Sequence, residues 1–138
     1  NAAPDFTYPD INGQNHSLTD YKGKYVYIDV WATWCKPCIF EIPYLKELED
    51  DYKNRNIVFM SVSIDEDVEK WKKMVTEKDL QGVQLIASDP ESKIKKDYII
   101  GGIPRFIFIG PGGEILDNEA ARPSNPETRE MFDSFSGL

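Results

Sequence analysis

The sequence is poor in side chains that bind metals. Its 138 residues include one histidine, His16, and two cysteines, Cys35 and Cys38. A structural zinc site needs about four Cys, His or carboxylate ligands, so we expect no metal site and no cofactor other than a redox-active disulfide. His16 stands in the polar stretch 12–17, where we expect a surface loop and no functional role.

Positive charge is also scarce. Lys and Arg number 16 against 24 Asp and Glu, which gives a formal net charge of -8. This charge repels phosphate backbones and disfavours a nucleic-acid partner. Long apolar runs are absent too: the stretch 103–109 is interrupted by Pro104 and Arg105 and is too short to span a bilayer. We therefore expect membrane association only through an anchor outside this sequence.

The size and composition indicate one globular domain over residues 1–138. Hydrophobic residues make up 41% and charged residues 29% of the chain, a balance typical of a single compact core. Nine Gly and nine Pro exclude collagen-like and low-complexity chains. The chain starts at Asn1 without an initiator Met or a leader, and we expect it to be the soluble part of a longer exported precursor.

Apolar patterning predicts an alternation of strands and helices. Residues up to 24 favour a hairpin or arm, and buried strands are expected at 25–31, 57–64 and 83–87. A hairpin is expected at 105–109 and 114–116. One helix is expected directly after the cysteines. Three more are expected: from Asp65 to about Lys78 with an N-cap in 65–67, from about Asp89 to Tyr98, and from Asn125 to Phe135. This order indicates an α/β fold with helices around a central mixed sheet.

The two cysteines belong to the segment Trp34-Cys35-Lys36-Pro37-Cys38. A disulfide across so small a loop contributes only about 2 kcal/mol on the chain-entropy formula, which disfavours a purely structural bond. A helix that begins near Pro37 places Cys35 at its N-terminus, where free N–H groups and the macrodipole favour a thiolate. We therefore predict that Cys35 is the attacking thiol and that Cys38, one turn deeper, is the resolving thiol of a reversible disulfide.

Three neighbours of the cysteines are expected to shape the site. Pro37 lies in the first helical turn, where its missing N–H costs nothing. Lys36 adds positive charge near Cys35, which stabilises the Cys35 thiolate and favours a protein that oxidises its partners. The alternative is that Lys36 is a solvated lysine without a role. Trp34, an aromatic residue beside an exposed sulfur, indicates a docking face, with core packing as the alternative.

Two carboxylates are candidates for deprotonating Cys38. Asp29 interrupts a buried strand six residues before Cys35, and a buried acid with a raised pKa suits this role. Glu41 lies three residues past Cys38 on the same helical face. The alternatives are a merely hydrogen-bonded Asp29 and an ordinary surface carboxylate at Glu41.

The run from Val30 to Cys38, followed by Glu41-Ile42-Pro43, resembles the thioredoxin superfamily and in particular its TlpA/ResA-like branch. The resemblance covers nearly the whole chain, including the segments 3–6, 18–24, 65–87 and 102–104. It implies a thioredoxin fold with an N-terminal β arm and a βα insertion from about 65 to 87.

The resemblance also implies particular site residues. It places a cis bond between Ile103 and Pro104, in a loop that pairs with substrate backbone beside Cys35. Asp29 matches the buried acid of thioredoxin, and Glu41 matches an active-site glutamate of the ResA-like branch. Because both acids are present, which of them serves Cys38 stays open.

The resemblance further implies a thiol-disulfide oxidoreductase. Members of the branch are mostly exported, are tethered to bacterial membranes, and reduce disulfides of partners such as apocytochrome c. We therefore expect an extracytoplasmic, monomeric protein that receives electrons from a membrane thiol donor and passes them to protein disulfides. The pair Lys36-Pro37 differs from the Gly-Pro of thioredoxin and the Glu-Pro of ResA-type sites, so the redox direction stays open.

Three other functions are alternatives to this one. A docking or assembly module would keep the disulfide as a regulatory latch without turnover. A peroxidase of the peroxiredoxin kind would have Thr or Ser three residues before its reactive cysteine and Pro four residues earlier, where Ala32 and Ile28 stand. A copper chaperone would need a different cysteine spacing and a ligand for which His16 is the sole candidate.

Overall fold

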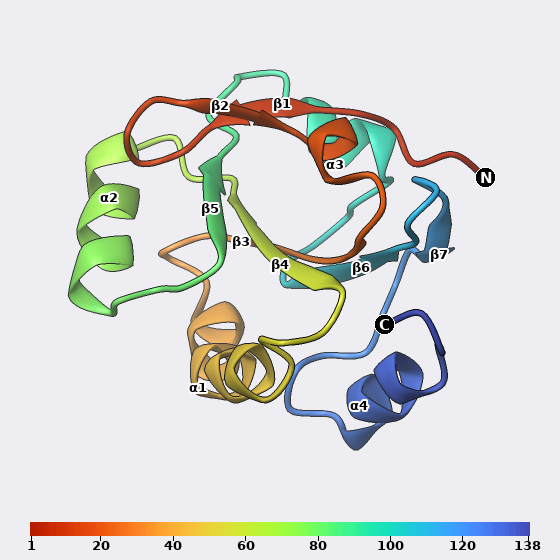
Figure 1. The fold of residues 1–138 in the computed structure, drawn as a ribbon. Helices are drawn as coiled ribbons and strands as arrows, with labels where there is room; N and C mark the ends of the chain where they lie inside the picture. The colour runs from red at the N-terminus through yellow and green to blue at the C-terminus, as the bar shows by residue number, and fades with distance from the viewer.

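The computed structural model describes residues 1–138 and has a five-stranded sheet in the order β5-β4-β3-β6-β7 (Figure 1). Strand β3 is parallel to β4, β4 is parallel to β5, and β6 is antiparallel to both β3 and β7. The predicted mixed sheet between helices is therefore confirmed. The strands are β3 (Tyr25–Trp31), β4 (Ile57–Ser63), β5 (Val83–Ile86), β6 (Arg105–Ile109) and β7 (Ile115–Asp117).

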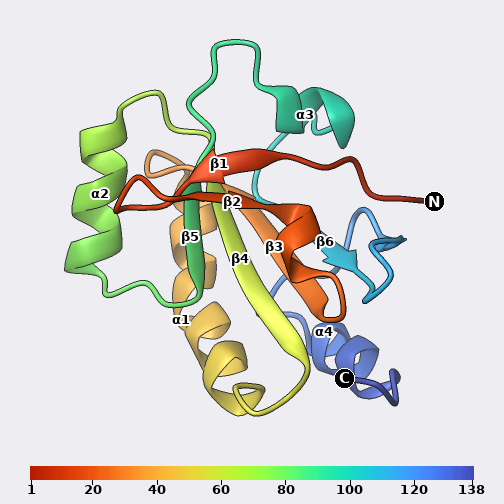
Figure 2. The ribbon, with the colours of Figure 1, turned by 45° about the horizontal axis from the view of Figure 1, so that its top comes forward.

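The two faces of the sheet are covered by different elements. Helices α1 (Lys36–Asp51) and α4 (Pro126–Asp133) lie together on one face, as Figures 1 and 2 both show. All of β3 is buried, as expected for a central strand covered on both sides. Because side chains alternate along a strand, Tyr25 and Tyr27 face α1 and α4. Asp29 shares this parity and therefore points to the same side.

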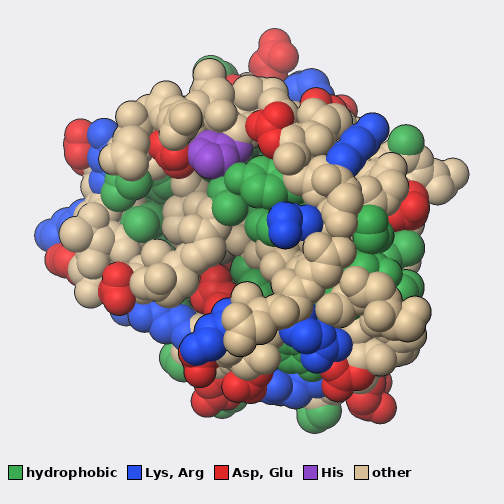
Figure 3. Space-filling model, in the orientation of Figure 1, with side chains coloured by type: hydrophobic (Ala, Val, Ile, Leu, Met, Phe, Trp, Pro, Cys, Tyr) green, Lys and Arg blue, Asp and Glu red, His purple; other side chains and the backbone are tan.

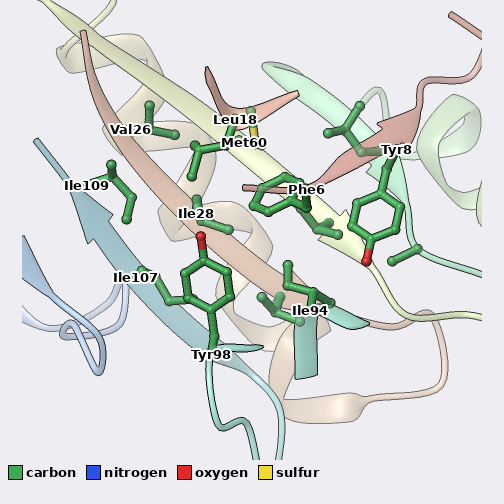
Figure 4. Packing of buried hydrophobic residues seen from close by; sticks show 14 of the residues in the cluster. Phe6, Tyr8, Leu18, Val26, Ile28, Met60, Ile94, Tyr98, Ile107 and Ile109 are labelled. Carbon is green, nitrogen blue, oxygen red and sulfur yellow. The ribbon is translucent and has the colours of Figure 1, made fainter. Parts of the chain in front are cut away.

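The other face is covered by the N-terminal arm, which is confirmed as a hairpin. Its strands β1 (Thr7–Pro9) and β2 (Asn15–Ser17) are antiparallel, and the 3-10 helix η1 (Leu18–Tyr21) follows them. Phe6, Tyr8 and Leu18 pack on the even-numbered residues of β3 and on neighbouring strands (Figure 4). The short helix α3 (Lys93–Asp97) adds Ile94 to the same cluster.

The segment 65–87 contains α2 (Val68–Glu77) and β5, and it adds one parallel strand to the sheet. Trp71 and Val75 bury the inner face of α2, as its apolar spacing predicts. Two helix boundaries were wrong. Helix α3 begins only at Lys93, after Ser92 in a left-handed conformation, and α4 ends at Asp133 rather than Phe135.

No helix combines the length and the apolar composition needed to cross a bilayer.

The prediction of a surface loop at His16 was wrong. The residue lies in β2 and is half-buried, with Nε2 2.7 Å from Asp10 Oδ2 and Nδ1 2.8 Å from the Tyr21 hydroxyl. These contacts join the hairpin to η1, which is a structural role.

On the face drawn in Figure 3, where the histidine is purple, basic and acidic side chains are interspersed.

Candidate active site

Cys35 and Cys38 form a disulfide at the N-terminus of α1, with their Cα atoms 5.2 Å apart. Cys35 is the N-cap residue of the helix, and its Sγ accepts a hydrogen bond from the Cys38 amide at 3.3 Å. The capping oxygen of an ordinary helix is thus replaced by a sulfur. A thiolate at this position would face an amide donor and the positive end of the helix dipole.

The surroundings of the disulfide are apolar on the inside and open on the outside. Cys35 is only 6% exposed, so the expected exposed sulfur was wrong for this disulfide state, in which the sulfur turns inward toward Cys38. Both cysteines pack in a cluster with Trp31 and Trp71. Trp34 is 66% exposed, which rules out core packing for its side chain. Lys36 and Pro37 are exposed as well.

The loop before β6 packs on the apolar cluster that contains the disulfide. The Ile103–Pro104 bond is cis, and Ile103 packs on the cluster that contains Cys35 and Cys38. Arg105 fastens this loop to its neighbours, because its guanidinium donates to the carbonyl oxygens of Tyr98 at 3.3 Å, Asn118 at 3.2 Å and Ile99 at 3.0 Å. Sequence reasoning missed Arg105, although a charged residue that opens an apolar strand was a visible signal.

Asp29 is buried under α1 at the centre of the sheet. Ser61 stands opposite it in the β3–β4 register, and the Ser61 hydroxyl donates to Asp29 Oδ2 at 2.9 Å. Burial, together with the nearby negative charge of Glu41, raises the pKa of Asp29 to about 7 against the lowering effect of the Ser61 hydrogen bond. A carboxyl with such a pKa can take and release a proton near neutral pH.

Glu41 is not a surface carboxylate, because only 3% of it is exposed. Its Oε1 accepts a hydrogen bond from the Ser124 amide at 2.9 Å, and its Oε2 accepts one from the Ser124 hydroxyl at 2.8 Å. Ser124 lies 83 positions further along the chain. Its part in the site could not be read from the local sequence.

A small cavity brings these groups together. Asp29, Cys38 and Glu41 all line it, so both predicted acids share one enclosed space with the predicted resolving cysteine. The volume of this cavity is about 20 Å³. No group of three or more His, Cys, Asp or Glu side chains is placed to hold a metal ion.

A third carboxylate, Glu49, lines the same cavity and was missed. Burial and the negative charge of Asp29 raise its pKa to about 7, with Lys46 acting in the opposite direction. The signal was present in the helical spacing, because Glu41, Leu45 and Glu49 recur every four residues and share one face of α1. Leu45 confirms the direction of this face, since it is buried.

The N-cap predicted within 65–67 is confirmed at Asp67, and Asp65 has a different role. The N-cap of α2 is Asp67, whose side chain accepts from the amides of the first turn. Asp65 is 2% exposed, and its carboxylate accepts hydrogen bonds from the Thr33 amide and hydroxyl and from the Ser63 hydroxyl. It therefore holds the loop that leads from β3 to Cys35.

We expect Asp65→Ala to lower the free energy of unfolding by about 2 kcal/mol, because it leaves buried donors on Thr33 and Ser63 without an acceptor. Urea unfolding followed by circular dichroism measures this loss. The matched control is Asp67→Ala, which removes a helix cap and is expected to cost about 1 kcal/mol. An equal or smaller loss for Asp65→Ala would contradict its role in holding the loop.

Comparison with known proteins gives a consistent result. The AhpC/TSA family matches residues 1–117. The thiol-disulfide oxidoreductase ResA of Bacillus cereus is 35% identical over 133 residues, which cover 96% of this chain and 73% of that protein. The ResA of Geobacillus kaustophilus is 35% identical over 116 residues, but this chain spans only 64% of its length.

Solved structures have the same fold. A Bacteroides vulgatus protein named for thiol-disulfide oxidoreductase activity is 48% identical, with a TM-score of 0.88 over 97% of this chain and 88% of its own. The thioredoxin domain of a second oxidoreductase from this organism is 31% identical, with a TM-score of 0.88 over 98% of this chain and 95% of its own. The chain therefore belongs to the AhpC/TSA family and has the thioredoxin fold of the ResA-related proteins.

Proposed function

We propose that this protein is a thiol-disulfide oxidoreductase that reduces disulfides of exported proteins, with cytochrome c maturation as the candidate pathway. The observation that carries the proposal is the Cys35–Cys38 disulfide at the start of α1, beside a cavity lined by buried carboxylates. The relatives named ResA and the oxidoreductase structures support it. We further propose an extracytoplasmic location and a membrane thiol donor of electrons, with no cofactor besides the disulfide.

The proposed chemistry has two exchange steps. The Cys35 thiolate attacks one sulfur of a partner disulfide, and the other partner sulfur leaves as a thiolate that takes a proton from solvent. Cys38 then gives its proton to a carboxylate in the cavity and attacks Cys35 Sγ. The bond between Cys35 and the partner breaks, and the second partner thiolate leaves. Two electrons thus pass from the dithiol to the partner.

The reduction potential of the pair tests this direction. We expect a value near or below about -250 mV, in the range of thioredoxin, whereas a value near about -120 mV would make the protein an oxidant. Equilibration in thiol buffers, followed by the fluorescence of Trp31 and Trp34, measures it. The Cys38→Ala variant is the control, because its fluorescence should not follow the buffer potential. A pair that does not titrate reversibly would favour a docking module without turnover.

A further inference from the structure

Two residues that line the cavity beside Cys38 each carry a buried polar atom without a protein partner. The indole nitrogen of Trp31, which is 3% exposed, donates to no group, and the Oε1 atom of Gln84, which is 9% exposed, accepts from none. Both side chains line the cavity together with Asp29 and Glu49. A donor, an acceptor and two carboxylates around a space large enough for one water form a polar site that a water molecule can bridge.

Glu49 stands between this cavity and solvent. Its carboxylate lies against Gly82, where a Cβ atom would come within 2.8 Å of Oε2, so the absence of a side chain at position 82 leaves room for it. Glu49 also borders the open groove between α1 and the ends of β4 and β5, and Lys46 and Gln81 line both spaces. Asp29 borders the cavity but not the groove.

We propose that Glu49 and Asp29 share a proton across this cavity and act as a pair that accepts the proton of Cys38. Glu49 is then a positioning residue, since it acts through Asp29 and not on a sulfur. The inference rests on the proposed dithiol chemistry. It adds a second, solvent-connected carboxylate to the resolving step.

The proton balance of the step is simple. The Cys38 thiol transfers its proton to the ionised Asp29 carboxylate, and the resulting thiolate displaces the partner sulfur from Cys35. The proton on Asp29 passes through the bridging water to Glu49, which releases it to the groove. When a donor reduces the disulfide, the same path runs in reverse and returns a proton to Cys38.

The charges around Glu49 set the direction of the expected effect. Asp29 on β3 raises the pKa of Glu49 and Lys46 on α1 lowers it. The other charged side chains that border the cavity or the groove are Glu41, Asp50 and Lys53 on α1 and Asp79 after α2. Because the repulsion between two carboxylates is mutual, removing the Glu49 charge favours the ionised form of Asp29 at lower pH. The pH at which Asp29 becomes an effective base therefore falls.

The test is the pH dependence of resolution in the Glu49→Gln variant. The reduced protein is mixed with 5,5′-dithiobis(2-nitrobenzoate), and the first thionitrobenzoate released reports attack by Cys35 while the second reports resolution by Cys38. We expect the midpoint of the pH profile of the second phase to move down by about half a unit or more. The first phase should keep its wild-type profile.

Two further variants separate this effect from a change in packing. Glu49→Asp retains the carboxylate and should keep a midpoint near that of the wild type. Glu47→Gln removes an exposed carboxylate of the same helix and should leave both phases unchanged. A wild-type midpoint in folded Glu49→Gln would overturn the pair. Absence of a second release in the wild type would instead overturn the proposed function itself.

Discussion

A Cys38→Ser variant will accumulate as a mixed disulfide with its partner proteins. Cys35 retains its place at the N-terminus of α1 and can still attack, but no neighbouring thiol remains to break the bond that it forms. Because the effective concentration of an adjacent thiol far exceeds that of free thiols, turnover should fall by at least about 100-fold. Non-reducing electrophoresis of a lysate of the source organism, followed by identification of the captured proteins, measures the trapping.

The matched control for this experiment is Cys35→Ser. Cys38 lies inside the first turn of α1 and lines the inner cavity, whereas Cys35 is the N-cap, so Cys38 should not reach a partner disulfide. We therefore expect captured proteins with Cys38→Ser and none with Cys35→Ser. Equal capture by both variants would contradict the assignment of the attacking thiol, and no capture by either would count against turnover of protein disulfides.

Replacing Asp29 by Asn will stabilise the protein above neutral pH. Burial raises the pKa of Asp29 from 3.8 to about 7, so the folded state binds its proton more tightly than the unfolded state does. The contribution of protonated Asp29 to the free energy of unfolding is fully present below about pH 4 and is lost as the pH rises to about 7. The loss corresponds to roughly 4 kcal/mol, and an uncharged Asn avoids it.

We expect a net gain of about 2 kcal/mol at about pH 8, because burying the Asn amide group offsets part of the benefit. The Asn side chain can still accept the hydrogen bond of Ser61. Below about pH 4 the gain should vanish, since Asp29 is then protonated in both states. Urea unfolding at a series of pH values measures the difference between variant and wild type.

Asp50→Asn is the control for this measurement, because Asp50 lies on α1 in an exposed position. Its stability should follow that of the wild type at every pH. A gain for Asp29→Asn that does not depend on pH would show that the charge of Asp29 is not its cause. The variant should also resolve mixed disulfides more slowly, because it lacks the buried base.

The local features of the site were predictable because they depend on short sequence separations. A strand, a short loop and a proline in the first turn place Cys35 at a helix N-terminus. The period-2 alternation of β3 puts Asp29 on the face that the following helix covers. The helical spacing puts Cys38 and Glu41 on one side of α1. Each of these relations spans fewer than about fifteen residues.

Contacts between distant segments decided the rest. Glu41 is a buried, doubly bonded carboxylate only because Ser124 lies against it, and Asp65 holds the loop before Cys35 only because β4 runs beside β3. Glu49 and Asp29 line one cavity, which residues of five separate segments enclose. The sequence by itself determined that the two cysteines lie at a helix N-terminus and on which face of the sheet Asp29 lies. The tertiary structure decided which acids are buried near one another, since burial and mutual repulsion of charges depend on every segment packed around them.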